Sequence, residues 1–335
     1  MENLERNNKL YNSYLTSAYA SHYETKDTTY YTYNSYMQQF MRYLYSYEGN
    51  PYLLDEDFLE DCVFIMERFI NYCRDNKKNN SQTIKNKIVA ISAFYKWCVK
   101  RNKIKFHPFA DKLDRPIVRE TDKRRNSYYL TWKDVFKVSV LMEVLPKTKI
   151  DKNGKISYSK DKKQFDLQSR LLWELFIESG FRITPIQNLK LSQLDLDRCV
   201  FTGIVHKGGK VKDLYFFDTA KKILIEFIEW RKENNINTDY LFCVKYEKEY
   251  HCMSQTAIRK RIRKIGKLLG IDDFYPHTIR KTVINNINNL TDIKTASEFA
   301  GHNSVTTTEK HYIQRQNAER ERDKIRMAML NQGLI

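Results

Sequence analysis

Six dispersed residues supply the side chains that cleavage of a phosphodiester through tyrosine would need. They are Arg182, Lys207, His277, Arg280, His302 and Tyr312. Guanidinium and ammonium groups can hold the charge of a phosphate, imidazoles can move protons, and a phenol can attack phosphorus. The set contains no cluster of carboxylates that would hold a metal. These residue types therefore predict covalent phosphoryl transfer, provided that the fold brings them together.

Taken one at a time, these residues also have ordinary explanations. An arginine such as Arg182 or a lysine such as Lys207 is commonly a solvated or ion-paired surface residue. The chain has 23 tyrosines, so the position of any one of them proves little. His277 and Arg280 are three residues apart, which places both side chains on one face of a helix. The argument for chemistry therefore depends on the whole set.

The composition favours a polyanionic partner. The 335 residues carry a formal net charge of +17, and most of the excess follows residue 110. Such a charge suits DNA or RNA through phosphate contacts and counterion release, although solvated surface lysines are the alternative. The six cysteines show no metal-ligand spacing and are expected to be reduced, buried thiols. No N-terminal apolar segment or membrane-length stretch occurs, so we expect a soluble, cytoplasmic protein with no membrane partner.

Hydrophobic periodicity predicts a small all-helical domain followed by a larger one. Helices are expected at 28–47 and 56–74, and another begins at Ser81, where apolar residues recur at helical spacing. The expected boundaries are an N-terminal extension at 1–24, a helical domain at 25–110, an exposed basic linker at 111–126, a second domain at 127–320 and a C-terminal tail at 321–335.

The second domain is expected to be mostly helical with one small antiparallel sheet. Residues 194–217 contain short apolar runs around the glycine-rich turn at 206–210, a pattern typical of a β-meander. The lysine-rich segment 147–164 contains Asn153-Gly154, which indicates a hairpin or a mobile loop. Further helices are expected before Gly180 and at 219–232, 254–269, 277–290 and 295–300, with a last one around Tyr312 that Thr306 and Glu309 would cap.

The order and spacing of the candidate residues resemble those of the tyrosine site-specific recombinases, or phage-type integrases. Gly180-Phe181-Arg182-Ile183-Thr184 resembles the family's G-x-R-[IV]-[ST] box, and His206-Lys207-Gly208-Gly209-Lys210-Val211-Lys212 resembles its G-K-G-x-K-x-R hairpin turn. Pro276-His277-Thr278-Ile279-Arg280-Lys281-Thr282 resembles H-x-L-R-H-T. Gly301-His302 and Tyr312 resemble the terminal G-H…Y box. In the first domain, the stretch from Ser81-Gln82-Thr83-Ile84 through Ala93-Phe94-Tyr95-Lys96-Trp97 and the later Pro108-Phe109 resemble the family's core-binding domain, so the likeness covers roughly residues 25–320.

The resemblance implies a fold and a set of roles. The fold would be mainly α, with an N-terminal helical core-binding (SAM-like) domain and a C-terminal mixed α/β catalytic domain that contains a small antiparallel sheet. Tyr312 would attack the scissile phosphate to give a 3′-phosphotyrosyl bond, while Arg182 and Arg280 would hold the nonbridging oxygens. Lys207 would protonate the leaving 5′-oxygen, His277 would exchange a proton with the tyrosine, and His302 would donate a hydrogen bond to the phosphate. No cofactor is implied, because the phosphotyrosyl bond conserves the energy for rejoining.

The sequence departs from the family pattern at two positions near these residues. Pro185 stands where the family usually has an acid three residues after the arginine, which leaves the support of Arg182 in question. Lys281 replaces the histidine that commonly follows the second arginine. Neither position belongs to the six candidate residues.

Two helices are candidates for contacts with double-stranded DNA. In the first domain the candidates are Gln82, Thr83, Lys85 and Asn86, at the start of a helix suited to the major groove. In the second domain the cations on the helix after Ser254 would contact phosphates, unless they are only a solvated face: Arg259, Lys260, Arg261 and Arg263. The two domains would close around DNA as a clamp.

The resemblance also implies assembly and leaves related functions open. The apolar tail, which includes Met327, Met329 and Leu330, would pass between protomers, giving a monomer or dimer free and a homotetramer on paired sites. The predicted function is integration, excision or resolution of DNA, with a bacterial, phage or plasmid origin. A type IB topoisomerase or a telomere resolvase would share the residue set. A DNA-binding regulator with an inactive fold is the non-enzymatic alternative, which Pro185 alone supports.

Overall fold

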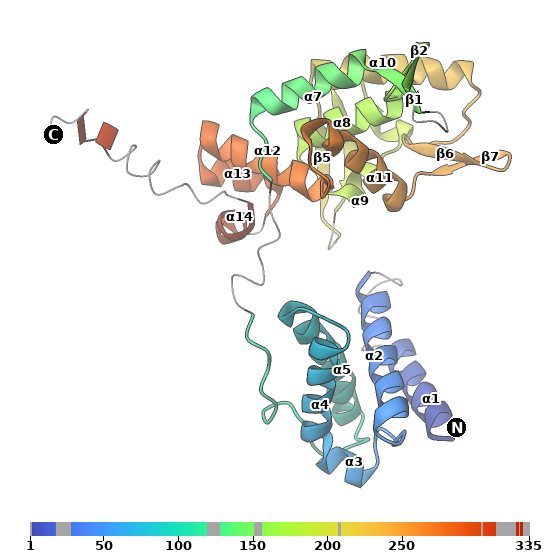
Figure 1. Ribbon diagram of the computed structural model, residues 1–335, viewed down its shortest axis with the longest axis vertical. Coiled ribbons are helices and arrows are strands. Elements are labelled where there is room, and N and C mark those ends of the chain that lie inside the picture. Colours follow the sequence, from blue (N-terminus) through green and yellow to red (C-terminus); the bar gives the residue numbers. More distant parts are fainter. Residues whose placement is uncertain are drawn as a thin grey trace. The chain divides into compact units, whose positions relative to one another are not determined.

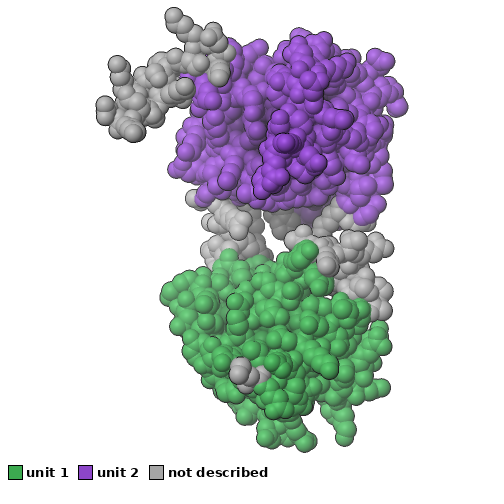
Figure 2. All heavy atoms as spheres, turned by 90° about the vertical axis from the view of Figure 1, so that its right-hand side faces the viewer, with its two compact units in different colours: residues 1–126 green, residues 127–335 purple. Residues whose placement is uncertain are grey.

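The chain forms two compact units, residues 1–126 and 127–335 (Figure 2). The structure is a computed structural model that describes residues 2–17, 28–118, 128–150, 156–206, 209–302, 304–312, 326–327 and 329–330. The architecture is mainly helical with small antiparallel sheets, which confirms the fold class expected from the sequence. No helix within these ranges is long and apolar enough to cross a membrane.

Unit 1 contains only helices among its described residues (Figure 1). They are α1 (Glu2–Thr16), α2 (Thr28–Tyr47), α3 (Glu56–Glu60), α4 (Cys62–Asp75) and α5 (Ser81–Lys100). The helix expected at 56–74 is divided at Asp61, which ends α3 and precedes α4. The α5 helix begins where the Asn80 side chain accepts a hydrogen bond from the backbone N–H of Thr83, an ordinary N-cap.

Helix α1 belongs to the core of unit 1, whereas the sequence suggested an N-terminal extension. Leu10, Tyr11 and Tyr14 are buried, and both tyrosine rings pack edge-on against Phe94 of α5. Counting tyrosine as polar concealed this apolar face, because a tyrosine ring can be buried with its hydroxyl near the surface. The expected linker also differs at its start, since Leu113 is buried in the same core. Residues 18–24 and 119–126 lie outside the described ranges.

Unit 2 surrounds the apolar helix α8 (Leu167–Ser179) with other helices (Figure 1). These are α7 (Trp132–Val144), α9 (Ile183–Gln187), α10 (Asp218–Glu233), α11 (Gln255–Gly266) and α12 (Pro276–Leu290), while α13 (Ile293–Ala300) and α14 (Val305–Tyr312) pack on α12. Five α8 side chains are fully buried: Leu171, Leu172, Trp173, Leu175 and Phe176. A helix that is apolar nearly all round must be buried on most of its surface, so α8 organises the core of this unit.

The described part of unit 2 contains three small antiparallel sheets. The expected meander is confirmed by β3 (Leu194–Asp195), β4 (Val200–Val205) and β5 (Val211–Tyr215), which pair in that order. Strands β1 (Pro146–Ile150) and β2 (Ile156–Lys163) pair antiparallel, and the Asn153-Gly154 segment between them lies outside the described residues. The sequence did not predict the hairpin of β6 (Cys243–Tyr246) and β7 (Glu249–Cys252). Its strands have four residues each, too few to show a clear period.

Candidate active site

Helix α12 places one candidate residue at the surface and another in the interior. Pro276 occupies the first helical position, where its missing N–H costs no hydrogen bond and its fixed φ favours the helix. His277 follows and is exposed, while Arg280, one turn later, is 2% exposed. The same helix buries Ile279, Val283 and Ile284, so packing fixes its rotation and directs Arg280 inward.

The guanidinium of Arg280 is held by hydrogen bonds from several directions. Nη1 donates to the carbonyl oxygen of Gly180 at 2.5 Å, and Nη2 donates to that of Ala300 at 2.7 Å. Nη2 also lies 3.1 Å from Nε2 of His302, and Nε donates to the Tyr312 hydroxyl at 3.4 Å. Burial lowers the pKa of Arg280, Arg182 lowers it further, and Tyr312 opposes both. The buried charge is therefore held by carbonyl dipoles, a phenol and an imidazole.

Gly180 is required where α8 ends beside this arginine. Its φ of +60° is in the left-handed region, which a side chain disfavours. A Cβ there would also lie 2.9 Å from the ring of Phe299 and 3.4 Å from Val283. The turn thereby directs the Gly180 carbonyl toward Arg280 and starts the segment that carries Arg182.

Tyr312 lies at the end of α14 and is 4% exposed. The helix begins at Val305 after Ser304, whose hydroxyl accepts from the backbone N–H of Thr306 at 3.2 Å. The expected capping box of Thr306 and Glu309 therefore does not start this helix; the cap lies two residues earlier. Helix α14 packs on α12 and α13, and this contact brings Tyr312 to Arg280 (Figure 1).

His302 follows the left-handed turn at Gly301 that ends α13. An arginine can only donate hydrogen bonds, so Nε2 of His302 accepts from Arg280. The proton of the neutral ring then resides on Nδ1, which donates to the Thr308 hydroxyl at 2.6 Å. The hydrogen-bond partners thus define one neutral tautomer in this structure.

Three of the candidate residues gather around the phenol of a fourth, Tyr312. The Tyr312 ring lies 4.6 Å from the His302 ring and 5.3 Å from the His277 ring, measured between centroids. The guanidinium carbon of Arg280 lies 5.3 Å from the centre of the same ring, within cation–π range. Residues that are 35 positions apart in the chain, from His277 to Tyr312, therefore meet in one cluster.

Arg182 lies at the N-cap of α9, half-buried and close enough to Arg280 to lower the pKa of that residue. Pro185 is buried in the first turn of α9, so this helix start contributes no carboxylate at that position. None of the ion pairs found among the described residues includes Arg182. Arg182, the fifth candidate, therefore lies at the edge of the cluster around Tyr312.

Lys207 lies outside the described residues, but a second lysine of the same motif reaches the site. Lys212 on β5 donates to the carbonyl oxygen of Glu298 at 3.3 Å, near the C-terminal end of α13. Its side chain also crowds Gly301, where an added Cβ would lie 2.7 Å from the Lys212 Nζ. A cation near helix carbonyls is favourable. Sequence reasoning did not select Lys212, although its place at the end of the G-K-G-x-K-x-R-like segment was a usable signal.

The basic helix α11 has two kinds of cations. Arg259, Lys260 and Arg263 are exposed, as DNA contacts would require. Arg261 instead faces α8 and forms an ion pair with Asp166, at 2.7 Å and 2.8 Å from its two carboxylate oxygens. The structure therefore places Arg261 in an internal contact, because its position on the helix faces the core of the unit.

The candidate DNA-reading residues of unit 1 lie at the start of α5. Gln82 and Asn86 are exposed and joined by a side-chain hydrogen bond of 3.0 Å. Thr83 and Lys85 are half-buried. Polar side chains with free hydrogen-bonding capacity suit base edges, so the arrangement is compatible with the predicted role.

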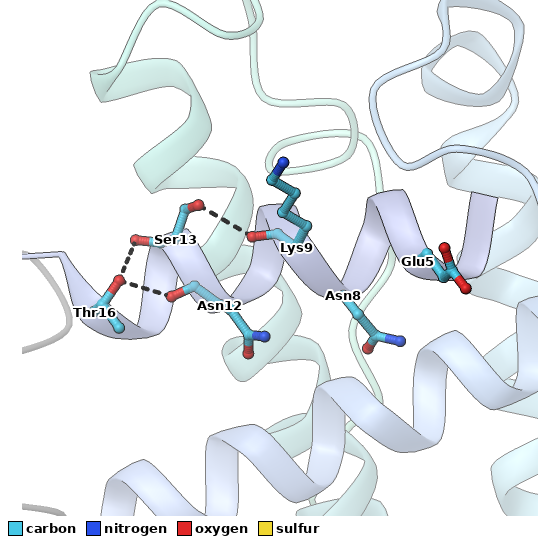
Figure 3. A pocket seen from close by; sticks show the side chains of 6 residues that line it. All are labelled: Glu5, Asn8, Lys9, Asn12, Ser13 and Thr16. Carbon is cyan, nitrogen blue, oxygen red and sulfur yellow. Dashed lines mark hydrogen bonds between the residues drawn. The ribbon is translucent and has the colours of Figure 1, made fainter. Parts of the chain in front are cut away.

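Other features of the described residues offer less chemistry. A pocket runs along α1 and is lined by polar side chains. The hydrogen bonds drawn in Figure 3 join side-chain hydroxyls to backbone carbonyls of the same helix. Its lining residues are Glu5, Asn8, Lys9, Asn12, Ser13 and Thr16. Within the described ranges, no three His, Cys, Asp or Glu side chains gather as metal ligands would.

Comparison with known sequences finds one family and consistent relatives. The model described as the phage integrase family matches residues 151–319. A protein named tyrosine recombinase XerC from Lactobacillus delbrueckii subsp. bulgaricus is 24% identical over 241 residues, covering 70% of this chain and 72% of the relative. The XerC of Leptospira interrogans serogroup Icterohaemorrhagiae is 22% identical over 290 residues, covering 77% of this chain and 91% of the relative.

Solved structures share the fold. The XerH site-specific recombinase bound to palindromic difH substrate aligns with a TM-score of 0.64 at 17% identity, over 88% of this chain and 78% of that one. A lambda integrase dimer bound to a COC' core site aligns with a TM-score of 0.62 at 15% identity, over 94% and 96% of the two chains. At such identities the likeness concerns the fold alone.

Proposed function

The chain belongs to the phage integrase family, the tyrosine recombinases, and we propose that it is a site-specific DNA recombinase whose nucleophile is Tyr312. The observation that carries this proposal is the burial of the Tyr312 phenol among Arg280, His302 and His277. A phenol next to a fixed guanidinium and two imidazoles has the groups needed for attack on phosphorus. The partner is a double-stranded recombination site.

In the proposed reaction, the Tyr312 oxygen forms a bond to phosphorus as the bond from phosphorus to the 5′-oxygen breaks. The phenolic proton passes to His277, and the leaving 5′-oxygen takes a proton from Lys207. Arg182 and Arg280 hold the nonbridging oxygens while negative charge develops. Attack by the 5′-hydroxyl of a partner strand reverses these steps and rejoins the DNA, which allows strand exchange.

The described arrangement requires local changes before such a reaction. The Arg280 guanidinium is engaged by carbonyls, His302 and Tyr312, so a phosphate must compete for its N–H groups. His302 must turn or bind a second proton before Nε2 can donate to a phosphate, because Nε2 accepts from Arg280 here. When DNA binds, its phosphate would form new hydrogen bonds with Arg280 and His302. These bonds would compensate for the contacts that the two residues lose.

Exposed cations of α11 and the start of α5 would bind the DNA, and several copies would act together. We place phosphate contacts at Arg259, Lys260 and Arg263, and base contacts at Gln82, Thr83, Lys85 and Asn86. Met327 and Leu330 are exposed in the described part of the tail, which suits exchange between protomers of a tetramer. Removal of residues 323–335 should then abolish synapsis of two DNA sites while leaving binding to one site intact.

The covalent intermediate provides the test of function. The full chain is incubated with nicked duplexes that tile the DNA flanking its gene, and the products are separated on denaturing gels. The wild type should form a covalent protein–DNA adduct, and Tyr312→Phe should form none while retaining DNA binding. Tyr215→Phe is the matched control, since Tyr215 is an exposed tyrosine of the same unit. An adduct that persists in Tyr312→Phe would place the nucleophile elsewhere.

A further inference from the structure

His206 stands at the boundary between β4 and the turn that leads to β5. Its backbone N–H donates to the Lys210 carbonyl at 2.7 Å, and its own carbonyl accepts from the Gly209 N–H at 3.2 Å. These two bonds close the turn on His206. Lys207 follows His206 directly in the sequence and lies outside the described residues.

The His206 ring connects this turn to the segment that carries Arg182. Its centroid lies 4.5 Å from that of the Phe181 ring, at an interplanar angle of 79°. Phe181 is only 6% exposed and immediately precedes Arg182. An edge-on contact between two such rings fixes their relative position, since the interior does not leave space for sliding. The contact therefore joins two segments that are distant in sequence and that both carry proposed catalytic residues.

The surroundings of His206 favour its neutral form. Burial lowers the pKa of the imidazole, and Lys212, Arg182 and Arg280 lower it further. These neighbours come from β5, the start of α9 and α12, and all are cations. The Nε2 atom of His206 is buried and has no hydrogen-bond partner among the described residues. A proton added to the ring would thus introduce another cation among three, without an acceptor at Nε2.

We propose that His206 is a positioning residue of the recombinase reaction, whose ring holds the end of β4 in register with Arg182 through Phe181. The inference deepens the proposed function and depends on it. His206 does not touch the reacting atoms in this account. It holds the end of β4 against Phe181, the residue before Arg182, at a place whose surroundings disfavour a charged ring.

Single-turnover cleavage of the nicked duplex tests this role in the full chain. His206→Ala removes the ring and should slow adduct formation by about 10²-fold, the scale expected when a catalytic group is misplaced by roughly 1 Å. DNA affinity, measured separately, should stay within about threefold of the wild-type value, because the substitution should not alter binding that is equal in the ground state and the transition state. His206→Phe retains an aromatic ring and should recover most of the rate at pH 7.5.

The pH profile distinguishes positioning from simple packing. As the pH falls through the lowered pKa of His206, the wild type should lose rate because the ring gains a proton. His206→Phe cannot gain that proton, so its rate should fall less between pH 7.5 and pH 5. His277 and His302 are present in both proteins, so the difference between the two profiles reports on His206. His251→Ala, at an exposed histidine of β7, should leave the rate and its profile unchanged.

The outcomes separate this inference from the proposed function. Wild-type cleavage with an equally fast His206→Ala variant would overturn the positioning role alone. So would a His206→Phe variant as slow as His206→Ala, or one with the wild-type pH profile. If His206→Ala fails to fold, the folded His206→Phe variant still tests the positioning role through its cleavage rate and its pH profile. If the wild type forms no adduct on any duplex, the proposed function fails and this inference fails with it.

Discussion

Two cationic regions of unit 2 differ in how their charges are held. Arg280 on α12 is buried and bonded to two carbonyls, an imidazole and a phenol. Helix α11 presents Arg259, Lys260 and Arg263 to solvent around a buried apolar stripe. A buried charge must be fully satisfied and so has one position, whereas exposed charges remain solvated and adaptable. The first arrangement suits chemistry on one phosphate, and the second suits a backbone of many phosphates.

The largest expected effect comes from changing the shape of the buried cation. Arg280→Lys preserves the charge but cannot reach Gly180, Ala300 and Tyr312 at once, because an ammonium lacks the planar fork. We expect adduct formation to fall by about 10³-fold, measured by single-turnover cleavage at saturating protein. Arg198→Lys is the control, because Arg198 is an exposed arginine with a long contact of 4.0 Å to Asp195. If Arg280→Lys forms the adduct at the wild-type rate, the buried cation needs only its charge. The proposed distinction between the buried Arg280 and the exposed cations of α11 is then wrong.

The buried carboxyl group of Glu174 in unit 2 allows the free-energy cost of burying a charge to be measured directly. Burial raises the pKa of Glu174 to about 7, while a hydrogen bond with Ser139 opposes the rise. The folded state therefore retains a proton that the unfolded state loses near pH 4.5, and the free energy of unfolding should decrease as the pH rises from about 4.5 to 7. The full loss is at most about 3 kcal/mol by linkage.

Glu174→Gln should remove this pH dependence and stabilise unit 2 at pH 8 relative to the wild type. Denaturant unfolding at pH 5 and pH 8 measures both effects. Glu229→Gln, at an exposed glutamate of α10, should change neither. If Glu174→Gln lowers stability at pH 8, the carboxylate is stabilised by its surroundings and the sign of the burial argument is wrong.

The exposure of Arg261 lies between that of the buried Arg280 and that of the exposed cations of α11, and Arg261 should behave as a structural residue. Burial raises the pKa of Asp166, but Arg261 and Ser169 together hold it below its usual range. Arg261→Ala should lower the free energy of unfolding by about 1 kcal/mol, because a two-oxygen contact is lost. Its effect on the salt dependence of DNA binding should be small. A large change in salt dependence without loss of stability would assign Arg261 to the DNA-binding face.

The smallest effect is expected on the open face of α11. Lys260→Ala should weaken DNA binding by less than about 1 kcal/mol and reduce the slope of log K against log salt by about 1, as loss of one phosphate contact would. Binding titrations at several salt concentrations measure the slope. Lys222→Ala on α10 is a matched control, since Lys222 is also an exposed helical lysine. Equal effects of the two substitutions would indicate a general charge effect.

Much of the site was predictable because its sequence signals are local. Pro276 before His277, the glycine stops at Gly180 and Gly301, and the apolar stripe of α12 each specify a helix boundary or face. These signals placed His277 and Arg280 on one face of a helix and His302 just after the end of another. The capping of α14 was mispredicted, because Ser304 and Thr306 both fit a cap and only packing selects between them.

Local periodicity and composition were enough to predict most helices, the β3–β5 meander, the basic character of α11 and the residue types available for phosphoryl transfer. Tertiary structure decided which cations are available. It buried Arg280 against carbonyls from α8 and α13, paired Arg261 with Asp166, and set the His206 ring on Phe181. Such contacts join residues up to 100 positions apart, and their partners depend on how helices pack rather than on any local pattern.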